Sequence, residues 1–130
     1  MKIVPLLGRI LFALIFVMSG LNHISGAGAD MTAAAGVPAA HVLVPIAGLL
    51  ALVGGVSILL GYKTKYGAWL IVIFLIPVTL ALHKFWGVAD PMQAQLQMAM
   101  FMKNVAMLGG ALLLAYFGGG PYSIDNNKAK

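Results

Sequence analysis

Four apolar runs, each close to the length of a membrane-spanning helix, constrain this sequence more than any other feature. The runs cover residues 3–21, 42–60, 67–82 and 98–117. A bilayer core about 30 Å thick takes about 20 residues of helix. Charged residues make up only 8% of the 130-residue chain, whereas soluble domains carry about a quarter. The sequence therefore predicts an all-α membrane protein, a bundle of four transmembrane helices in a single domain over residues 1–130.

The first run also has features of a secretory signal peptide. It has a basic start and an apolar centre, and Ala27-Gly28-Ala29 has the small residues of a cleavage site. We interpret residues 3–21 as a retained transmembrane span.

The charged residues indicate how the bundle is oriented. With the N-terminus in the cytoplasm, the inner segments hold Lys2, Lys63, Lys65, Lys128 and Lys130, and Arg9 lies close to that side. The outer loops hold Lys84, Asp30 and Asp90. This positive-inside bias predicts that both termini of this multi-pass protein are cytoplasmic. The net charge of +5 is scattered rather than gathered in a patch, so we expect the lipid bilayer and no nucleic acid as a partner.

Short interfacial helices are predicted in both outer loops. Asp30 can cap a helix that runs through residue 35 and ends at Gly36. Asp90 and Pro91 have the residue types of an N-cap and a first helical position, so the fourth helix should begin near Pro91 with its first turns at the interface.

Small residues four positions apart predict where helices approach each other closely. Ala47, Ala51 and Gly55 form such a stripe in the second run, and Ala106 and Gly110 do so in the fourth.

Six side chains in or beside the spans are candidates for binding a ligand or a partner. They are Lys103, Asn104, His83, His23, Trp86 and Arg9. His23 and His83 end the first and third helices at a depth similar to that of Lys103, so polar groups from three helices could form an outer pocket. For His23, His83 and Trp86 taken singly, interfacial anchoring is the favoured alternative.

Lys103 is the most unusual of these residues. It lies about 7–8 Å below the level at which the fourth apolar run begins. The four spans hold no Asp or Glu, so an inward-facing Lys103 has no carboxylate partner in its own chain. It would be neutral or hydrated, contact a quinone carbonyl or a lipid phosphate, or pair with another subunit. For Lys103 with Asn104, two alternatives stay open with equal weight. The pair either binds a ligand or another subunit, or it anchors the helix at the membrane interface.

Arg9 lies on one face of the first helix with Phe16, Gly20 and His23, within about 60° on a helical wheel. One interpretation is a polar seam that faces the bundle interior. The favoured alternative for Arg9 is that its side chain extends to the cytoplasmic interface.

Several kinds of chemistry are absent from the sequence. There is no Cys, which excludes disulfides, thiol relays and haem attached through thiols. Of the eight Met residues only some share a helix face, as Met98 and Met102 do, so flexible packing is favoured over a soft-metal site. Without a metal triad or paired acids, autonomous catalysis is not favoured and no metal is expected. No cofactor is indicated with certainty, and a quinone is the candidate.

Taken together, the motifs resemble the DoxX family of small four-helix membrane proteins. The matching pieces are Arg9…Phe16…Gly20, Gly36-Val37-Pro38, Gly54-Gly55…Gly61, His83-Lys84-Phe85-Trp86, Phe101-x-Lys103-Asn104-x-Ala106-Met107-x-Gly109-Gly110, and Ser123-Ile124-Asp125 after a glycine-rich stop. Two positions depart from the family pattern. Family members often have a Lys after the first-helix glycine, where this chain has His23, and many carry an acid near the position of Ala51.

The resemblance implies a multi-pass protein of a bacterial inner membrane, an accessory subunit of a redox or respiratory complex that contributes to a quinone or lipid site. Its partners would be other membrane subunits or further copies of the chain. The alternatives are a stand-alone quinone-linked membrane oxidoreductase, or a lipid-binding or assembly protein with no redox role. An enzyme would hold its polar groups around one cavity, and an accessory subunit would turn its small-residue stripes or Lys103 toward a neighbouring chain.

Overall fold

The computed structural model describes residues 1–128, and four of its helices are long and apolar enough to cross a membrane. These are α1 (Ile3–Ile24), α3 (Ala40–Leu60), α4 (Thr64–Leu82) and α5 (Pro91–Phe117). Two short helices, α2 (Ala29–Ala34) and α6 (Ile124–Lys128), lie outside the spans. The predicted four-helix membrane fold is confirmed. Lys130, one of the predicted inner charges, lies outside the described residues.

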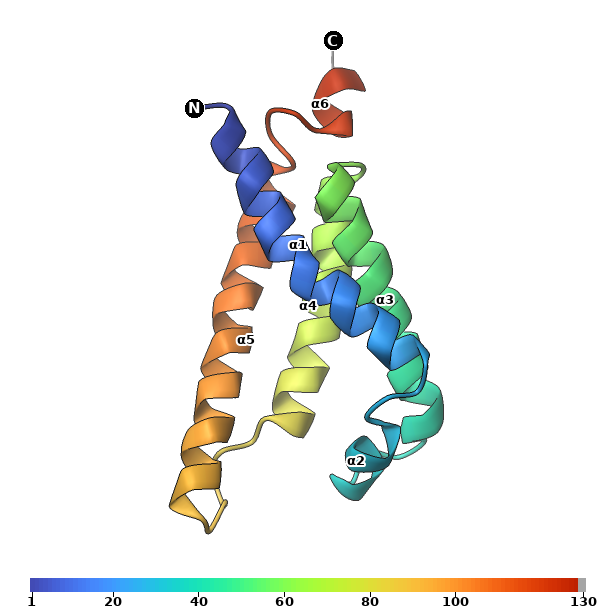
Figure 1. Cartoon of the computed structure of the whole chain (residues 1–130), viewed down its shortest axis with the longest axis vertical. Helices are drawn as coiled ribbons and strands as arrows, with labels where there is room; N and C mark the ends of the chain where they lie inside the picture. The colour runs from blue at the N-terminus through green and yellow to red at the C-terminus, as the bar shows by residue number, and fades with distance from the viewer. Residues whose placement is uncertain (129–130) are drawn as a thin grey trace.

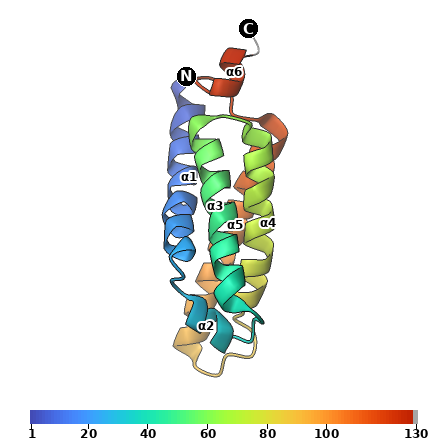
Figure 2. The ribbon, with the colours of Figure 1, turned by 90° about the vertical axis from the view of Figure 1, so that its right-hand side faces the viewer.

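The long helices alternate in direction, which gives the bundle two distinct ends. The start of α1, the turn between α3 and α4, the end of α5 and the whole of α6 gather at one end, named here the termini end (Figures 1 and 2). Helix α2 and the connection from α4 to α5 lie at the opposite end, named here the loop end. Both termini therefore lie on the same side, as predicted.

Glycines bring the backbones of α1 and α3 into direct contact. A Cβ added to Gly20 would lie 2.6 Å from the backbone nitrogen of Leu52 and 2.8 Å from the carbonyl oxygen of Gly48. Gly55, from the predicted stripe in α3, also faces α1, since its Cβ would lie 3.1 Å from the backbone nitrogen of Val17. Small residues allow this approach because no side chain separates the helices.

Helices α3 and α4 are antiparallel neighbours joined by a tight turn. A Cβ on Gly54 would lie 2.9 Å from the carbonyl oxygen of Gly67, and a Cβ on Gly67 would lie 3.1 Å from that of Gly54. The apolar core lies among α1, α3 and α4, and α5 adds Ala111 to it. Its fully covered members are Ala13, Phe16, Ala51, Ile58, Ala68, Ile71, Leu75 and Ala111.

Helix α5 is the least covered of the four spans. It packs along α4, while α1 runs diagonally away from it toward the loop end (Figure 1). Near the termini end α5 meets α1, where a Cβ on Gly110 would lie 2.9 Å from the ring of Phe12. Only 17% of the apolar window of α5 is buried, against 39% for α4. Of the two small residues predicted to face a neighbouring helix, Gly110 does so and Ala106 is exposed.

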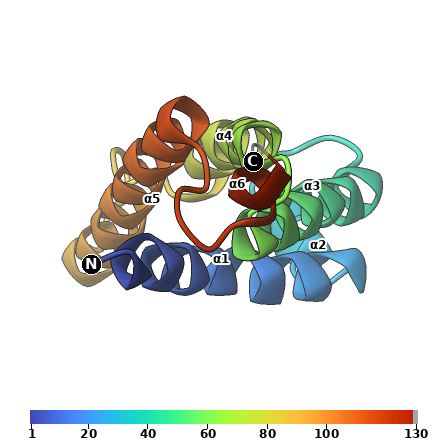
Figure 3. The same cartoon turned by 90° about the horizontal axis from the view of Figure 1, so that it is seen from above.

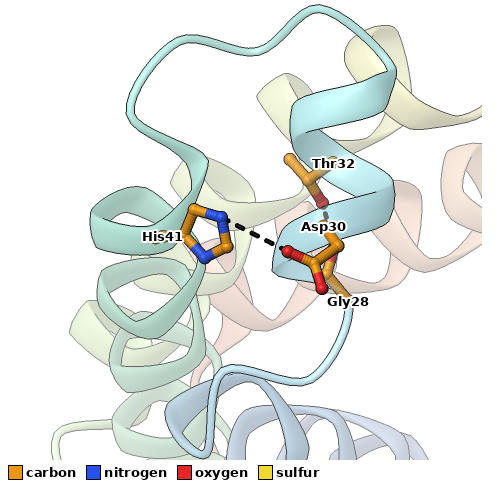
Figure 4. A network of polar contacts seen from close by, with 4 residues as sticks. All are labelled: Gly28, Asp30, Thr32 and His41. Atoms are coloured by element: carbon orange, nitrogen blue, oxygen red, sulfur yellow. Dashed lines mark hydrogen bonds and ion pairs between the residues drawn. The ribbon is translucent and has the colours of Figure 1, made fainter.

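The loop end differs from the sequence prediction in one detail. Helix α2 begins after Gly28, which has a φ of +85°, so Asp30 lies in the first turn and is not the N-cap. The Asp30 carboxylate instead lies 3.3 Å from Nε2 of His41, and the Thr32 hydroxyl donates to the carbonyl oxygen of Gly28 (Figure 4). In the second loop, Asp90 caps α5 as predicted, and the helical residues from 91 onward are continuous with the fourth span.

Candidate functional site

The structure separates the candidate residues rather than placing them around one pocket. His23, near the end of α1, lines a cavity that is also bordered by residues of α2, α3 and α4. His83 and Asn104 lie where α4 contacts α5, and Lys103 lies on the exposed surface of α5. The cavity that His23 lines does not include His83, Asn104 or Lys103, and α1 and α5 diverge toward the loop end (Figure 1).

His23 lines an apolar cavity of about 260 Å³ at the loop end, named here the His23 cavity. Its walls come from α3 and α4, and the other polar side chain at its edge is Thr32, which already donates its hydroxyl hydrogen to Gly28. Apolar residues on the walls include Val44, Ala47, Leu50, Phe74, Val78 and Ala81. Nδ1 of His23 lies 2.6 Å from the carbonyl oxygen of Ser19, and its ring meets Phe74 edge-on with centroids 6.2 Å apart. Because a carbonyl oxygen only accepts, this contact requires a proton on Nδ1, and in the tautomer with that proton Nε2 can accept a hydrogen bond.

Asn104 connects α5 to α4 inside the bundle. Its side chain is only 5% exposed, and Nδ2 donates a 3.0 Å hydrogen bond to the Thr79 hydroxyl, which is also buried. A buried amide in a membrane span needs such a partner, because lipid offers none. The bond makes Asn104 a contact between two helices of this chain.

His83 and Trp86 hold the loop end of α4 against α5. Nδ1 of His83 lies 3.0 Å from Oε1 of Gln97. Trp86 forms edge-to-face contacts with Phe85 and Phe101, at centroid distances of 5.2 and 5.9 Å, and its side chain is half exposed. This arrangement fits interfacial anchoring, the favoured alternative for each of these residues.

Lys103 points away from the rest of the chain. Its Nζ lies 3.5 Å from the sulfur of Met100, one turn closer to the loop end. The contact between His83 and Gln97 places the end of α4 level with Gln97, so Lys103 starts about 9 Å deeper, at 1.5 Å per residue. Helical side chains lean toward the helix N-terminus, which for α5 is the loop end, so the ammonium group reaches part of the way back to the outer boundary.

Lys103 borders an exposed surface that we name the α5 face. The face consists of Met98, Ala99, Met102, Lys103, Ala106, Gly109 and Leu113, all of them exposed. A Cβ added to Gly109 would have no other atom within 4 Å, so no contact within the described chain requires glycine there.

Arg9 does not extend into the aqueous interface, so the favoured prediction for it is wrong. Its side chain is 2% exposed. Nη2 donates a 2.6 Å hydrogen bond to the carbonyl oxygen of Tyr122, and Nη1 a longer one of 3.5 Å to that of Ile58. The interior-facing alternative fits this burial, since Arg9, Phe16 and Gly20 are all buried residues of α1, whereas His23 is half-buried. The C-terminal segment covers Arg9, which is why the side chain stays out of water.

Sequence reasoning missed the residues that close the termini end. Asp125 accepts hydrogen bonds from the backbone N–H groups of Lys63 and Thr64, at 2.7 and 2.9 Å, and from the Thr64 hydroxyl at 2.8 Å. It thus caps α4 from 61 residues away, and its negative charge also acts on Arg9. A Cβ on Gly61 would clash with Nη1 of Arg9. One feature of the sequence could have indicated this contact. Lys63, just before α4, has no side chain suited to cap the helix, so the cap has to come from elsewhere in the chain.

Figure 3, viewed from the termini end, shows α6 lying over the ends of α3 and α4. The backbone N–H of Asp125 donates a 2.8 Å hydrogen bond to the carbonyl oxygen of Gly61, which fixes α6 to the turn between those helices. Within residues 1–128, no three His, Asp or Glu side chains come together as a metal site.

Comparisons with known proteins agree with this architecture. The chain is 36% identical to the inner membrane protein YqjF of Escherichia coli, over 92% of this chain and 88% of that protein. It is 29% identical to the inner membrane protein YphA of Escherichia coli, over 92% of this chain and 86% of that protein. It is 28% identical to the ER-derived vesicles protein ERV29 of Saccharomyces cerevisiae, over 62% of this chain but only 26% of that protein. No solved structure matches.

The family comparison covers the first four helices. The DoxX family model matches residues 4–84, which include α1, α2, α3 and α4, so the fourth-span motif around Lys103 lies outside the matched range. Since the match spans more than half of the sequence, and YqjF is similar over nearly all of it, the chain belongs to the DoxX family.

Proposed function

We propose that the chain is an accessory subunit of a larger redox or respiratory complex in a bacterial inner membrane, and that it binds its partner through the α5 face. Two of its relatives are named inner membrane proteins. The excess of Lys at the termini end supports a cytoplasmic position for both termini. The redox assignment rests on the resemblance to DoxX proteins, and the docking role rests on the structure of α5.

The observation that carries the proposal is the exposure of small residues on α5. Gly is about 1 kcal/mol less favourable than Ala in a helix interior, and Gly109 gains no contact within the described chain in return. Ala106 lies one turn away on the same exposed surface. Small residues on a transmembrane helix allow a second helix to approach closely. The α5 face therefore fits a helix of another subunit.

The charge of Lys103 indicates which side chain the partner helix should present to it. A cation within a span is stabilised by an opposite charge or by an oxygen-rich partner. A second copy of this chain has no Asp or Glu in its spans to offer. The proposed partner is therefore a different protein, with a transmembrane helix that bears a carboxylate in the outer half of the membrane.

Site-specific photo-crosslinking tests this docking. A photoreactive residue at position 109 should form an adduct with a transmembrane peptide that contains Asp or Glu, and one at position 8 should not. Gly8 is the matched control because it is also an exposed helical glycine with no atom within 4 Å of an added Cβ. Adducts at position 109 with lipid alone, or with this chain alone, would rule the proposal out.

Substitutions supply a second test of the same interface. Gly109→Leu and Lys103→Met should reduce co-purification of the partner at least tenfold, while Gly8→Leu should not. None of the three variants should unfold in detergent at a lower temperature than the unchanged protein, because neither glycine position has an atom within 4 Å of an added Cβ and Lys103 is exposed. Equal losses of partner retention and thermal stability would make Lys103 a structural residue.

A second candidate function, binding of a quinol or a lipid, is favoured by the His23 cavity. The cavity is apolar apart from His23 and Thr32, and the tautomer of His23 that donates from Nδ1 to the Ser19 carbonyl offers Nε2 as an acceptor. A quinol ring combines an apolar body with a hydroxyl donor, which matches this lining. Decylubiquinol binding should fall at least tenfold in His23→Phe and remain unchanged in His83→Phe. Equal binding by both variants would exclude the His23 cavity as the quinol site.

A further inference from the structure

A groove of about 450 Å³ lies at the termini end, between the first turn of α4 and the end of α5. It is separate from the His23 cavity and from the α5 face. Its walls include Lys63, Lys65, Tyr66, Phe117 and the glycines 118–120. The groove thus combines two cations with two aromatic rings, where both helices reach the membrane boundary.

The two lysines present positive charge to the groove. Neither forms an ion pair with any residue in the described part of the chain. Nζ of Lys63 lies 5.7 Å from the ring centroid of Tyr62. The stem of Lys65 passes over the end of α5, because a Cβ on Gly118 would lie 3.4 Å from its Cε. Lys65 is exposed and lines the groove, so its ammonium group is available to a ligand there.

Asp125 is the acidic residue that lines the groove, and its carboxylate already accepts hydrogen bonds from the start of α4. It accepts the backbone N–H groups of Lys63 and Thr64, and its charge acts on the buried Arg9. Arg9 and Asp125 together contribute no net charge. The two lysines therefore leave the groove with a net positive charge that an anion can balance.

The surface beside the groove is apolar and faces the lipid. Tyr66 and Phe117 are 74% and 71% exposed, and beyond them Trp69 on α4 is 50% exposed, nearer the bundle centre. Aromatic residues mark the interfacial level of a membrane protein, so the groove lies at the depth of lipid headgroups. A ligand that fills it would be anionic at one end and apolar at the other.

We propose that this groove binds the headgroup of an anionic phospholipid, with the phosphate between Lys63 and Lys65 and the acyl chains along α4 and α5. Basic sites at the ends of transmembrane helices attract such headgroups. A soluble phosphate ion shares the same charge chemistry but not the acyl chains, so the two sources can be separated by experiment.

Fluorescence quenching provides the test, because the chain has only two Trp residues. Trp86→Phe removes the one at the loop end and leaves Trp69, one turn beyond Lys65, as the reporter. The full chain in lipid discs should be quenched more strongly by phosphatidylglycerol with brominated acyl chains than by brominated phosphatidylcholine. Replacing both lysines, by Lys63→Gln with Lys65→Gln, should abolish that preference, a loss of roughly 30-fold if each contributes as a typical membrane-surface cation does.

Three controls decide between the outcomes. Lys84→Gln, at the loop end, should keep the preference, and so should Lys63→Arg with Lys65→Arg, which retains both charges. Inorganic phosphate at millimolar concentration should leave the quenching unchanged. Equal quenching by the two lipids, a preference that survives the double Gln substitution, or displacement by inorganic phosphate would each overturn the proposal. The lipid comparison and the Arg variant remain decisive even if the double Gln variant is unstable.

Discussion

The guanidinium group of Arg9 donates a 2.6 Å hydrogen bond to the carbonyl oxygen of Tyr122, which is 113 positions away in the chain. This contact joins the first span to the segment that follows the last one. Asp125 extends the connection, since it caps α4 and attracts Arg9. The termini end is therefore held together by charged groups from both ends of the sequence.

Removing the Arg9 charge should destabilise the termini end. Arg9→Met keeps an apolar chain of similar length but loses the charged donors to Tyr122 and Ile58, and hydrogen bonds to charged groups are worth about 1.5–3 kcal/mol each. We expect a loss of about 2–3 kcal/mol in the free energy of unfolding in detergent micelles, mostly from the short bond to Tyr122, because the 3.5 Å bond to Ile58 is weak. Proteolysis after residue 117 should also become faster. Lys2→Met, an exposed cation at the same end, is the control, and equal effects of the two substitutions would contradict the assigned role of Arg9.

The cap supplied by Asp125 should contribute measurably to stability. Asp125→Asn removes a negative charge from the N-terminus of α4 and leaves one acceptor oxygen for three donors. The expected loss is about 1–2 kcal/mol, in the range of helix-capping and helix-dipole effects. Denaturant titration measures it, with Asp30→Asn as the reference. Asp30→Asn should change the free energy of unfolding little, because the contact of Asp30 with His41 is largely exposed to solvent.

The bond between Asn104 and Thr79 predicts energetic coupling between α4 and α5. A double-mutant cycle of Asn104→Leu and Thr79→Val should give a coupling energy of about 0.6–1.7 kcal/mol, the range found for such bonds within membranes. Unfolding of the four proteins in the same detergent measures this quantity. A coupling energy indistinguishable from zero would show that the two side chains are held in place by packing alone.

Two glycines of α1 should respond in opposite ways to Ala. Gly20→Ala places a Cβ against the backbone of α3 and should cost more than 2 kcal/mol, because rigid main-chain atoms cannot move aside. Gly8→Ala meets open space and should raise stability by up to about 1 kcal/mol, through helix propensity. Thermal unfolding of both variants tests the α1–α3 contact directly. Similar shifts for the two substitutions would show that the contact is looser than described.

Local features of the sequence predicted the framework well. Each span follows from the length of an apolar run, and the cap at Asp90 follows from two adjacent residues. The small residues Gly55 and Gly110 were correctly expected at helix contacts. The exposure of Ala106 was not expected. A small residue can pack against a helix of the same chain or against a helix of another chain, and the sequence does not distinguish the two.

The sequence by itself determined how many times the chain crosses the membrane and that its termini lie together, because each span depends on its own hydrophobicity and length. Only the tertiary structure decided that Arg9 is buried under the C-terminal segment, and that His23 and Lys103 face different surroundings. Those outcomes depend on how each helix is rotated and where α1 diverges from α5. Rotation and crossing are set by contacts between residues far apart in the chain, such as Gly20 with Gly48 and Arg9 with Tyr122, which no local pattern specifies.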